Sequence, residues 1–405
     1  MTVKDLLSAS AVRRAAQRML QGAEASRLLH WDIDLSRLPA VAERVASVTR
    51  ANYPDLNVPF HARWRHFEAG GRDRWKSIAS WQDKQTKARG AFDLAIVSVL
   101  LDAGSGGRWS YREPASGEQF RASEGLAVAS FDLVANGALS ARSGEPWRAD
   151  AERLAGFTAA DLTHAFQVSS ENPLAGSEGR VKLLNNLGSV CAARPDIFAI
   201  ADSPRPGGLV HAIVARSSNG EIAAPAILEL VLEALGPIWP SRLEIDGVPL
   251  GDAWLYPPWQ PVAESMADAV VPFHKLSQWL AYSLIEPLQE LGLEVTGIGG
   301  LTGLAEYRNG GFFVDGGAIR LKEPAGAERI HDVASPLVVE WRALTVALLD
   351  LLHPLVAERL GTTVERFPLA CLLQGGTWSA GRLLAQEKRA GGGPPILIRS
   401  DGTTF

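Results

Sequence analysis

The stretch that decides the fold runs from Val271 to Leu321 and reads VPFHKLSQWLAYSLIEPLQELGLEVTGIGGLTGLAEYRNGGFFVDGGAIRL. In its first part, leucines recur at steps of four, four, four and three residues and form one apolar helix face: Leu276, Leu280, Leu284, Leu288 and Leu291. Pro287 has no N–H, so it frees the carbonyl of Ser283 and is expected to kink or end the helix there. The pattern predicts a helix that begins near Lys275.

A glycine-punctuated loop follows this helix and leads to a charged triplet. Its glycines are residues 297, 299, 300 and 303, and the triplet is Glu306-Tyr307-Arg308. Lys275 and Glu306 are 31 positions apart, which is enough for a helix, a turn and a return path. We therefore expect the lysine ammonium and the glutamate carboxylate to lie in one cleft, with Gln278 and Arg308 beside them.

Four segments resemble a family of uracil-catabolism proteins found in fungi and bacteria. They are HKLSQWLAYSL from His274, LTGLAEYRNGGFFVDGG from Leu301, SPLVVEWRALTVALLDLL from Ser335 and LLQGGTWSAGR from Leu372. The resemblance extends over nearly the whole chain. It implies a role beside a uracil phosphoribosyltransferase and a cyclohydrolase-like protein.

More remotely, the chain is similar to the queuosine-nucleotide N-glycosylases of queuosine salvage. That family has a lysine, a later Asp-Tyr-Arg triplet and a helix with Glu-x-Arg. The counterparts here are Lys275, Glu306-Tyr307-Arg308, and Glu340 with Arg342. Glutamate in place of aspartate moves the carboxylate by one methylene. The similarity implies the helical architecture shared by queuosine salvage proteins and helix-hairpin-helix glycosylases.

Composition limits the class of protein. With 405 residues, 46% hydrophobic and 21% charged, the chain can bury a sizeable core. A net charge of −5 argues against nucleic-acid binding. Two cysteines fit a reducing compartment, and the charges within residues 1–20 argue against a secretory signal. The longest apolar run, residues 336–356, contains charges and a proline, so it predicts a buried helix and not a membrane span. We expect a cytoplasmic protein that does not bind membranes.

Repeated helical patterns along the chain predict a mainly α fold with a few short β-strands. We expect one compact domain of residues 1–405. The alternative is two lobes: a helical N-terminal lobe of residues 1–236, and a C-terminal lobe of residues 237–405 that carries the catalytic motifs. The boundary falls at the start of a segment rich in Pro, Gly and Trp, residues 236–261, which is typical of an ordered loop.

Residues 57–81 combine arginine, histidine and tryptophan around a Gly-Gly turn. His61, Arg63 and Arg65 in this segment suit a phosphate and a sugar, because arginine binds phosphate through two hydrogen bonds. The alternative is a solvated surface anchored by its tryptophans. Two apolar helical segments also carry carboxylates, for which capping or buried pairing is the more frequent role: Asp93, Asp102, Glu124 and Asp132.

The motifs of other chemistries are absent from the sequence. Its eight histidines form no HxxxH or HExxH, neither cysteine lies in CxxC, and there is no GxSxG. The TGIGG glycines do not fit a dinucleotide-binding GxGxxG. We therefore expect an enzyme that uses neither a metal nor a cofactor.

Glu340 and Arg342 lie in the most apolar run, where a charge is destabilising unless it is paired. Residues two apart on a helix do not face each other, so each needs a partner from elsewhere. A buried ion-pair network is one explanation; a position of Arg342 near Glu306 or the substrate is the other. Glu306 and Lys275 are the better catalytic pair, although a structural salt bridge would also explain them.

A carboxylate at position 306 can polarise a water and stabilise an oxocarbenium-like transition state at C1′ of a ribose. With the family resemblance, this predicts an N-ribosyl hydrolase of pyrimidine catabolism that cleaves a ribosylurea 5-phosphate to urea and ribose 5-phosphate. Alternatives are an amidohydrolase acting on a ring-opened pyrimidine nucleotide, or a non-catalytic partner of the cyclohydrolase-like enzyme. Contact with the pathway's other enzymes is also expected.

The expected catalytic residues are Glu306 and Lys275. Those expected to contact the phosphorylated ribosyl substrate are His274, Gln278, Tyr307, Arg308, Asp315, His61, Arg63, Arg65, Arg342 and Trp378.

Overall fold

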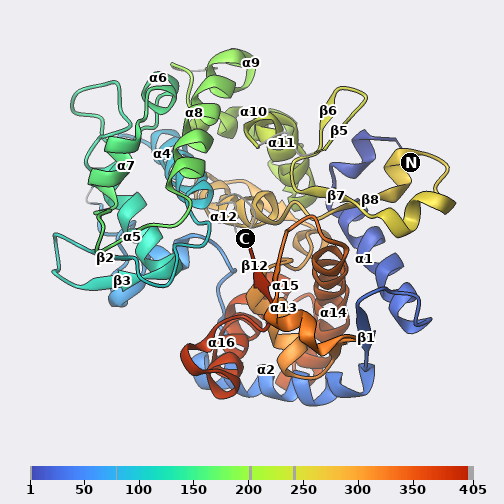
Figure 1. Cartoon of the computed structure of the whole chain (residues 1–405). Coiled ribbons are helices and arrows are strands. Elements are labelled where there is room, and N and C mark those ends of the chain that lie inside the picture. Colours follow the sequence, from blue (N-terminus) through green and yellow to red (C-terminus); the bar gives the residue numbers. More distant parts are fainter. Residues whose placement is uncertain (1, 79, 200–202, 240–242, 400–405) are drawn as a thin grey trace. The chain divides into compact units, whose positions relative to one another are not determined.

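The computed structural model describes residues 2–78, 80–199, 203–239 and 243–399 (Figure 1). Helices dominate and the strands are short, which confirms the predicted mainly α fold class. By their contacts, the described residues form two units, each built from several stretches of chain. Unit 1 takes its residues from 2–61, 243–278 and 297–399; unit 2 takes them from 62–239 and 279–296.

Unit 1 is organised around one long buried helix. The helices of this unit are α1 (Ala9–Glu24), α2 (Leu38–Asn52), α13 (Tyr307–Asp315), α14 (Pro336–Leu360), α15 (Leu369–Leu372) and α16 (Trp378–Lys388). Ser335 caps the N-terminus of α14, and Gly361 ends the helix at a φ of 71°. Helices α1, α2 and α13 pack against α14 (Figure 1). Both Glu340 and Arg342 on α14 are buried. The predicted buried helix is therefore confirmed.

Short strand pairs connect distant segments of unit 1. Strand β1 (Trp31–Ile33) pairs antiparallel with β10 (Ile319–Leu321), and β11 (Ile330–His331) pairs parallel with β12 (Leu397–Ile398). Strands β5 (Glu244–Ile245) and β6 (Val248–Pro249) form a hairpin. Strand β7 (Ala253–Leu255) pairs with β8 (Val270–Pro272), with Ala253 opposite Pro272. This last register places Asp252 beside the segment that leads into the next helix.

Unit 2 surrounds the apolar helix α4 (Lys84–Leu100), which Asp83 caps by accepting the N–H of Thr86 at 2.6 Å. Its other helices are α3 (Trp64–Phe67), α5 (Ala122–Ala135), α6 (Ala151–Ala155), α7 (Ala159–Ala165), α8 (Ser177–Ala193), α9 (Pro195–Phe198), α10 (Leu209–Arg216) and α11 (Ala224–Leu235). Strands β2 (Ser110–Arg112) and β3 (Gln119–Arg121) pair antiparallel. Strand β4 (Glu221–Ala223) pairs parallel with β9 (Glu294–Thr296), so unit 2 needs a segment from late in the chain.

Helix α12 (Lys275–Leu291) is the predicted leucine-faced helix. It begins at Lys275, as predicted, and it continues past Pro287. The sequence predicts that Pro287 kinks or ends the helix. The second alternative is wrong, because the helix continues to Leu291 and the freed carbonyl finds another donor. The indole Nε1–H of Trp64 donates to the Ser283 carbonyl oxygen at 2.7 Å within unit 2. The Ser283 hydroxyl also accepts the backbone N–H of Arg63 at 2.9 Å. A tryptophan thus replaces the backbone donor that proline lacks.

The segment predicted as a lobe boundary contains β5, β6 and β7, and its residues 240–242 lie outside the described part of the chain. The organisation into one domain, or into lobes that meet at 236/237, stays a prediction. In the part of the chain that the structure describes, no helix is both long enough and apolar enough to cross a bilayer.

Candidate active site

Lys275 begins α12 directly after a residue with an unusual backbone conformation. His274 has a φ of 49°, in the left-handed region that non-glycine residues seldom adopt. Beyond this turn, the Lys275 N–H donates to Oδ2 of Asp252 at 3.0 Å. The Asp252 carbonyl accepts the N–H groups of Phe273 and His274 at 2.9 and 3.1 Å. Asp252 therefore holds the start of the helix, and Lys275 is only 9% exposed.

Glu306 is the N-cap of α13. Its Oε1 accepts the N–H of Asn309 at 2.7 Å, and its Oε2 accepts the N–H of Arg308 at 2.5 Å. A helix N-terminus favours a negative charge, because its first N–H groups have no intrahelical partner. Each carboxylate oxygen can still accept another hydrogen bond, so Glu306 is fixed in place yet able to orient a water.

The surroundings of Glu306 act on its proton in opposite directions. Burial raises the pKa of the Glu306 carboxyl, while the Lys275 ammonium and the N–H groups of Arg308 and Asn309 act to lower it. Burial is the larger effect, so the carboxyl holds its proton more strongly than an exposed glutamic acid. The charge of Lys275 is felt at Glu306, so these two side chains of unit 1 are electrostatic neighbours.

His61 also belongs to the surroundings of Lys275. Burial, with a smaller contribution from the charge of Lys275, lowers the pKa of His61 to about 4, against the opposing effect of the hydrogen bond with Gln374. Nδ1 of His61 lies 3.0 Å from Oε1 of Gln374, whose amide nitrogen donates to the Tyr53 hydroxyl at 3.3 Å. We therefore assign the imidazole proton to Nδ1. A neutral His61 offers a proton acceptor and not the positive charge that a phosphate needs.

Gln374 is held by an irregular turn of helix. Residues Leu373–Thr377 form a π-helical turn between α15 and α16, a feature that often marks functional sites. A Cβ at Gly376 would lie 2.3 Å from Val45 Cγ1 and 2.8 Å from Thr49 Oγ1. Glycine is needed there because the turn lies directly against α2. This gives a structural reason for the LLQGGTWSAGR motif.

Gln278 contacts the loop that leads to Glu306. Its amide nitrogen donates to the Thr302 hydroxyl, and its amide oxygen accepts the Thr302 N–H at 3.0 Å. The side chain is almost fully buried. The contact that the structure shows for Gln278 is therefore with Thr302 in this loop, and a substrate contact stays a prediction.

Glu340 and Arg342 both find partners from distant segments, as their burial requires. Glu340 accepts the N–H groups of Leu29 and His30 at 3.0 and 2.9 Å and the Tyr256 hydroxyl at 2.5 Å. Arg342 forms two hydrogen bonds with the Asp252 carboxylate, at 2.7 and 2.8 Å. Burial opposes ionisation of Asp252, but Arg342 holds the pKa of this carboxyl well below its usual range.

Three of the residues predicted to contact the substrate have partly exposed side chains: Tyr307, Arg308 and Trp378. The Arg308 guanidinium lies 5.3 Å from the Tyr307 ring centre and donates to the Gly392 carbonyl at 3.3 Å. The Arg382 guanidinium lies 5.6 Å from the Trp378 ring centre. All four side chains belong to unit 1.

Asp315 lies at the opposite end of α13 from Glu306. Nine residues of α-helix separate them by about 13 Å along the axis. Both Asp315 oxygens accept hydrogen bonds from Arg389 at 2.6 Å. Helix α13 thus does not bring Asp315 to the end that holds Glu306.

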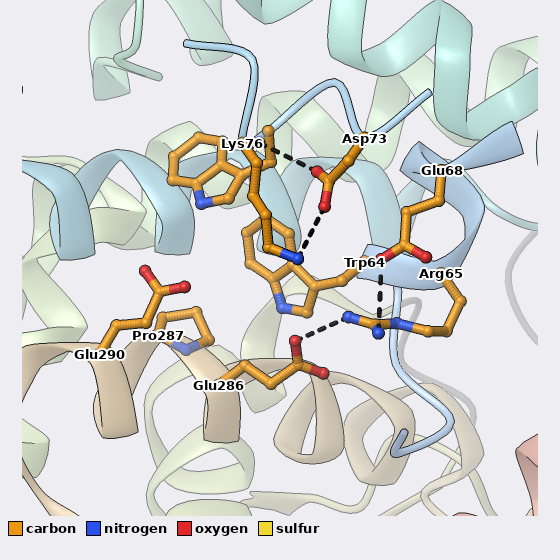
Figure 2. A pocket seen from close by; sticks show the side chains of 9 residues that line it. Trp64, Arg65, Glu68, Asp73, Lys76, Glu286, Pro287 and Glu290 are labelled. Carbon is orange, nitrogen blue, oxygen red and sulfur yellow. Dashed lines mark hydrogen bonds and ion pairs between the residues drawn. The ribbon is translucent and has the colours of Figure 1, made fainter. Parts of the chain in front are cut away.

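Arg63 and Arg65 belong to unit 2. Arg63 is fully buried and donates to the Asp102 carboxylate and the Ser98 hydroxyl, both at 2.7 Å. Arg65 forms a 2.7 Å ion pair with Glu286 at the rim of a pocket (Figure 2). The residues lining this pocket, mostly mutually paired charges and tryptophans, are Trp64, Arg65, Glu68, Asp73, Trp75, Lys76, Glu286, Pro287 and Glu290.

The other carboxylates noted in the sequence have structural partners in unit 2. Asp93 pairs with Arg205 at 3.1 Å, and Asp132 accepts the Tyr111 hydroxyl at 2.7 Å. Asp102 pairs with Arg63 as above, and the charge of Glu124 also acts on Arg63. Within the described ranges, no group of three or more His, Cys, Asp or Glu side chains could hold a metal ion.

Sequence reasoning missed two residues of this site, Asp252 and Gln374. Asp252 precedes a short strand in the segment interpreted as loop, where no pattern marks it as buried. Gln374 lies within LLQGGTWSAGR, and the paired glycines after it were a usable signal of close packing. Asp252 contacts the recognised residue Lys275, and Gln374 contacts the recognised residue His61.

The fold and this site define a mainly helical protein in which a lysine and a carboxylate at the starts of two helices act on each other. The chain belongs to the family described as Protein of unknown function (DUF1688), which matches residues 5–405. It is 40% identical to Protein urg3 of Schizosaccharomyces pombe over 419 residues, covering 100% of this chain and 99% of that protein.

A second relative is Uracil catabolism protein 4 of Lachancea kluyveri. The identity is 38% over 409 residues, covering 93% of this chain and 92% of that protein. The predicted membership in the uracil-catabolism family is therefore confirmed. The remoter similarity to queuosine salvage glycosylases stays a prediction.

Proposed function

We propose that this protein acts in uracil catabolism as an N-ribosyl hydrolase, with Glu306 and Lys275 as its catalytic residues. The name of the relative Uracil catabolism protein 4 supports the pathway. The substrate is a ribosylurea 5-phosphate or a similar intermediate, and the products are urea and ribose 5-phosphate. Substrate contacts are assigned to the partly exposed side chains of Tyr307, Arg308 and Trp378.

The observation that carries this proposal is the state of Glu306. Its carboxylate is fixed by two backbone N–H groups, its pKa is raised by burial, and a lysine charge opposes that rise. A base whose pKa is moved toward neutral pH accepts a proton from water more effectively than an ordinary glutamate. A fixed negative charge also stabilises positive charge at C1′ in the transition state.

In the proposed reaction, water loses one proton to Glu306 and the leaving urea nitrogen gains one proton. Glu306 accepts a proton from water as the water oxygen bonds to C1′. The C1′–N bond breaks, and its electron pair stays on the urea nitrogen, which takes up a proton. Lys275 keeps Glu306 ionised before the reaction and can donate a hydrogen bond to a ribose hydroxyl. The step needs no oxidant, reductant or second substrate.

The test is Glu306→Gln, which removes the charge but keeps the side chain's size and an acceptor for the α13 N–H groups. We expect kcat to fall on the order of 10²-fold or more, with KM nearly unchanged, because the lost interaction acts in the transition state. Lys275→Ala should also slow turnover, and its effect should combine non-additively with Glu306→Gln. Release of urea and of ribose 5-phosphate is measured on the same samples.

Asp83→Asn is the matched control, because Asp83 is also a carboxylate N-cap, at the start of α4. It should alter stability and leave kcat unchanged. A folded Glu306→Gln variant with full activity would remove this residue from the mechanism. Release of ammonia without ribose 5-phosphate would favour the amidohydrolase, and binding without turnover would favour the non-catalytic partner.

A further inference from the structure

One buried ion pair connects the segments that carry the two proposed catalytic residues. Arg342 is 1% exposed and lies on the core helix α14. Its Nη1 and Nη2 donate to the two oxygens of Asp252, and its Nε donates to the carbonyl of Ala305 at 3.1 Å. Ala305 directly precedes Glu306. The Arg342 guanidinium thus contacts the residue directly before Glu306.

Asp252 in turn contacts Lys275 and the two residues before it. Its carboxylate accepts the Lys275 N–H and, at 2.9 Å, the indole N–H of Trp254. Its backbone carbonyl accepts the N–H groups of Phe273 and His274, the two residues before Lys275. Asp252 therefore determines where α12 begins and, with it, the position of the Lys275 Cα atom.

The turn between these contacts is conformationally strained. His274 adopts a left-handed backbone, which costs on the order of 1 kcal/mol or more for a non-glycine residue. Its Nε2 lies 2.9 Å from the Leu6 carbonyl oxygen, whereas its buried Nδ1 has no hydrogen-bond partner in the described part of the chain. A strained turn with an unsatisfied buried atom persists only if neighbouring contacts hold it. The contacts to Asp252, together with the one to Leu6, hold this turn.

We propose that Asp252 is a positioning residue that, through Arg342, fixes Lys275 and Glu306 relative to each other. The inference rests on the proposed function, because it assigns a role in the same site. Arg342, expected from the sequence to contact substrate, acts in this proposal through Asp252 and Ala305. Removal of the Asp252 charge takes away the carboxylate that Arg342 contacts through two hydrogen bonds, so α12 and the residue before Glu306 can move apart.

The test measures the interaction between Lys275 and Glu306 directly, without an activity assay. The chain has eight lysines, so the protein labelled with ¹³C at lysine Cε gives few NMR signals, and Lys275→Arg identifies the one of interest. The Lys275 pKa is titrated with and without Glu306→Gln. In otherwise wild-type protein, loss of the carboxylate should lower the Lys275 pKa by about one unit or more.

The same pair of titrations is then made with Asp252→Asn present throughout. Comparison within one background cancels the direct effect of the Asp252 charge on Lys275. If Asp252 positions the pair, Glu306→Gln should now shift the Lys275 pKa by less than about half as much. An undiminished shift would overturn the role of Asp252. No shift in the wild-type background would instead overturn the Lys275–Glu306 pair and, with it, the proposed function.

Two further variants distinguish a positioning role of Asp252 from a general loss of stability. Asp150→Asn disrupts a comparable buried pair in unit 2, where Arg148 contacts both Asp150 oxygens at 2.6 and 3.0 Å. It should leave the Lys275 titration unchanged. Arg342→Lys keeps the charge but loses the planar fork that contacts Asp252 and Ala305 together. If Asp252→Asn does not fold, Arg342→Lys takes its place, with the same result expected and the same result contradicting the proposal.

Discussion

At the scale of single residues, the buried carboxylates of this protein differ in how their charge is balanced. Glu340 accepts three hydrogen bonds, and Asp252 is balanced by the fork of Arg342. Asp93 is less well balanced: it is fully buried, accepts the Gly207 N–H at 2.6 Å, and pairs with Arg205 at 3.1 Å. Burial raises the pKa of Asp93 to about 6, against the effect of Arg205.

This raised pKa predicts the sign of a pH effect on stability. The folded protein binds the Asp93 proton more tightly than the unfolded chain, whose carboxyl titrates near 3.8. The cost of the buried charge is therefore present above pH 6 and is relieved as the pH falls toward 4. From pH 7 to pH 5, this group alone should raise the free energy of unfolding by on the order of 1 kcal/mol.

Urea denaturation at the two pH values checks this, by comparing wild type with Asp93→Asn. The variant should lack the gain between pH 7 and pH 5. Asp150→Asn is the control, because the pKa of Asp150 is lowered and its charge changes little in this range. An Asp93→Asn variant with the wild-type pH dependence would show that Asp93 titrates normally.

At the scale of elements, helix α12 shows how a proline can be accommodated inside a buried helix. Pro287 supplies no N–H to the Ser283 carbonyl, and the Trp64 indole donates to it instead. Trp64 and Pro287 lie on the same pocket of unit 2 (Figure 2). The continuity of the helix therefore depends on a side chain from α3.

A double-mutant cycle tests this dependence. Trp64→Phe keeps an aromatic ring but removes the donor, so it should lower the free energy of unfolding by about 1–3 kcal/mol. Pro287→Ala restores a backbone N–H that can reach the Ser283 carbonyl. In that background, Trp64→Phe should cost less by about 1 kcal/mol. Equal costs in the two backgrounds, measured by denaturant unfolding, would mean that the indole donor is not what completes the helix.

At the scale of the whole molecule, neither unit is a continuous piece of chain. In unit 1, α1 and α2 pack on α14, which begins nearly 300 residues later. In unit 2, β4 pairs with β9 from beyond the predicted lobe boundary. A break in the chain near that boundary therefore leaves each piece with parts of both units.

A cleavable version of the full chain tests this arrangement. The exposed turn Asp246–Gly247 between β5 and β6 accepts an inserted protease site. After cleavage, the two pieces should still co-elute near the 43.4 kDa of the intact chain and should separate only in denaturant. Separation in native buffer would instead support two independent lobes. An uncleaved sample with the same insertion serves as control.

The amino-acid sequence by itself determined the fold class, the main helices and the family. The apolar face of α12 and the buried run of α14 are local patterns, and local patterns depend on neighbours within a few residues. Lys275 and Glu306 were recognised because short motifs carry them. Even the free carbonyl of Ser283 followed from one proline.

Only the tertiary structure decided which residues are partners. Arg342 and Asp252 are 90 positions apart, and Glu340 and Tyr256 are 84 apart. Sequence patterning shows that a buried charge needs a partner, but many distant residues could supply it. The same holds for Arg63, whose predicted phosphate contact stays a prediction and whose partner Asp102 is 39 positions away. Packing between distant segments makes that choice, and local patterns carry no information about it.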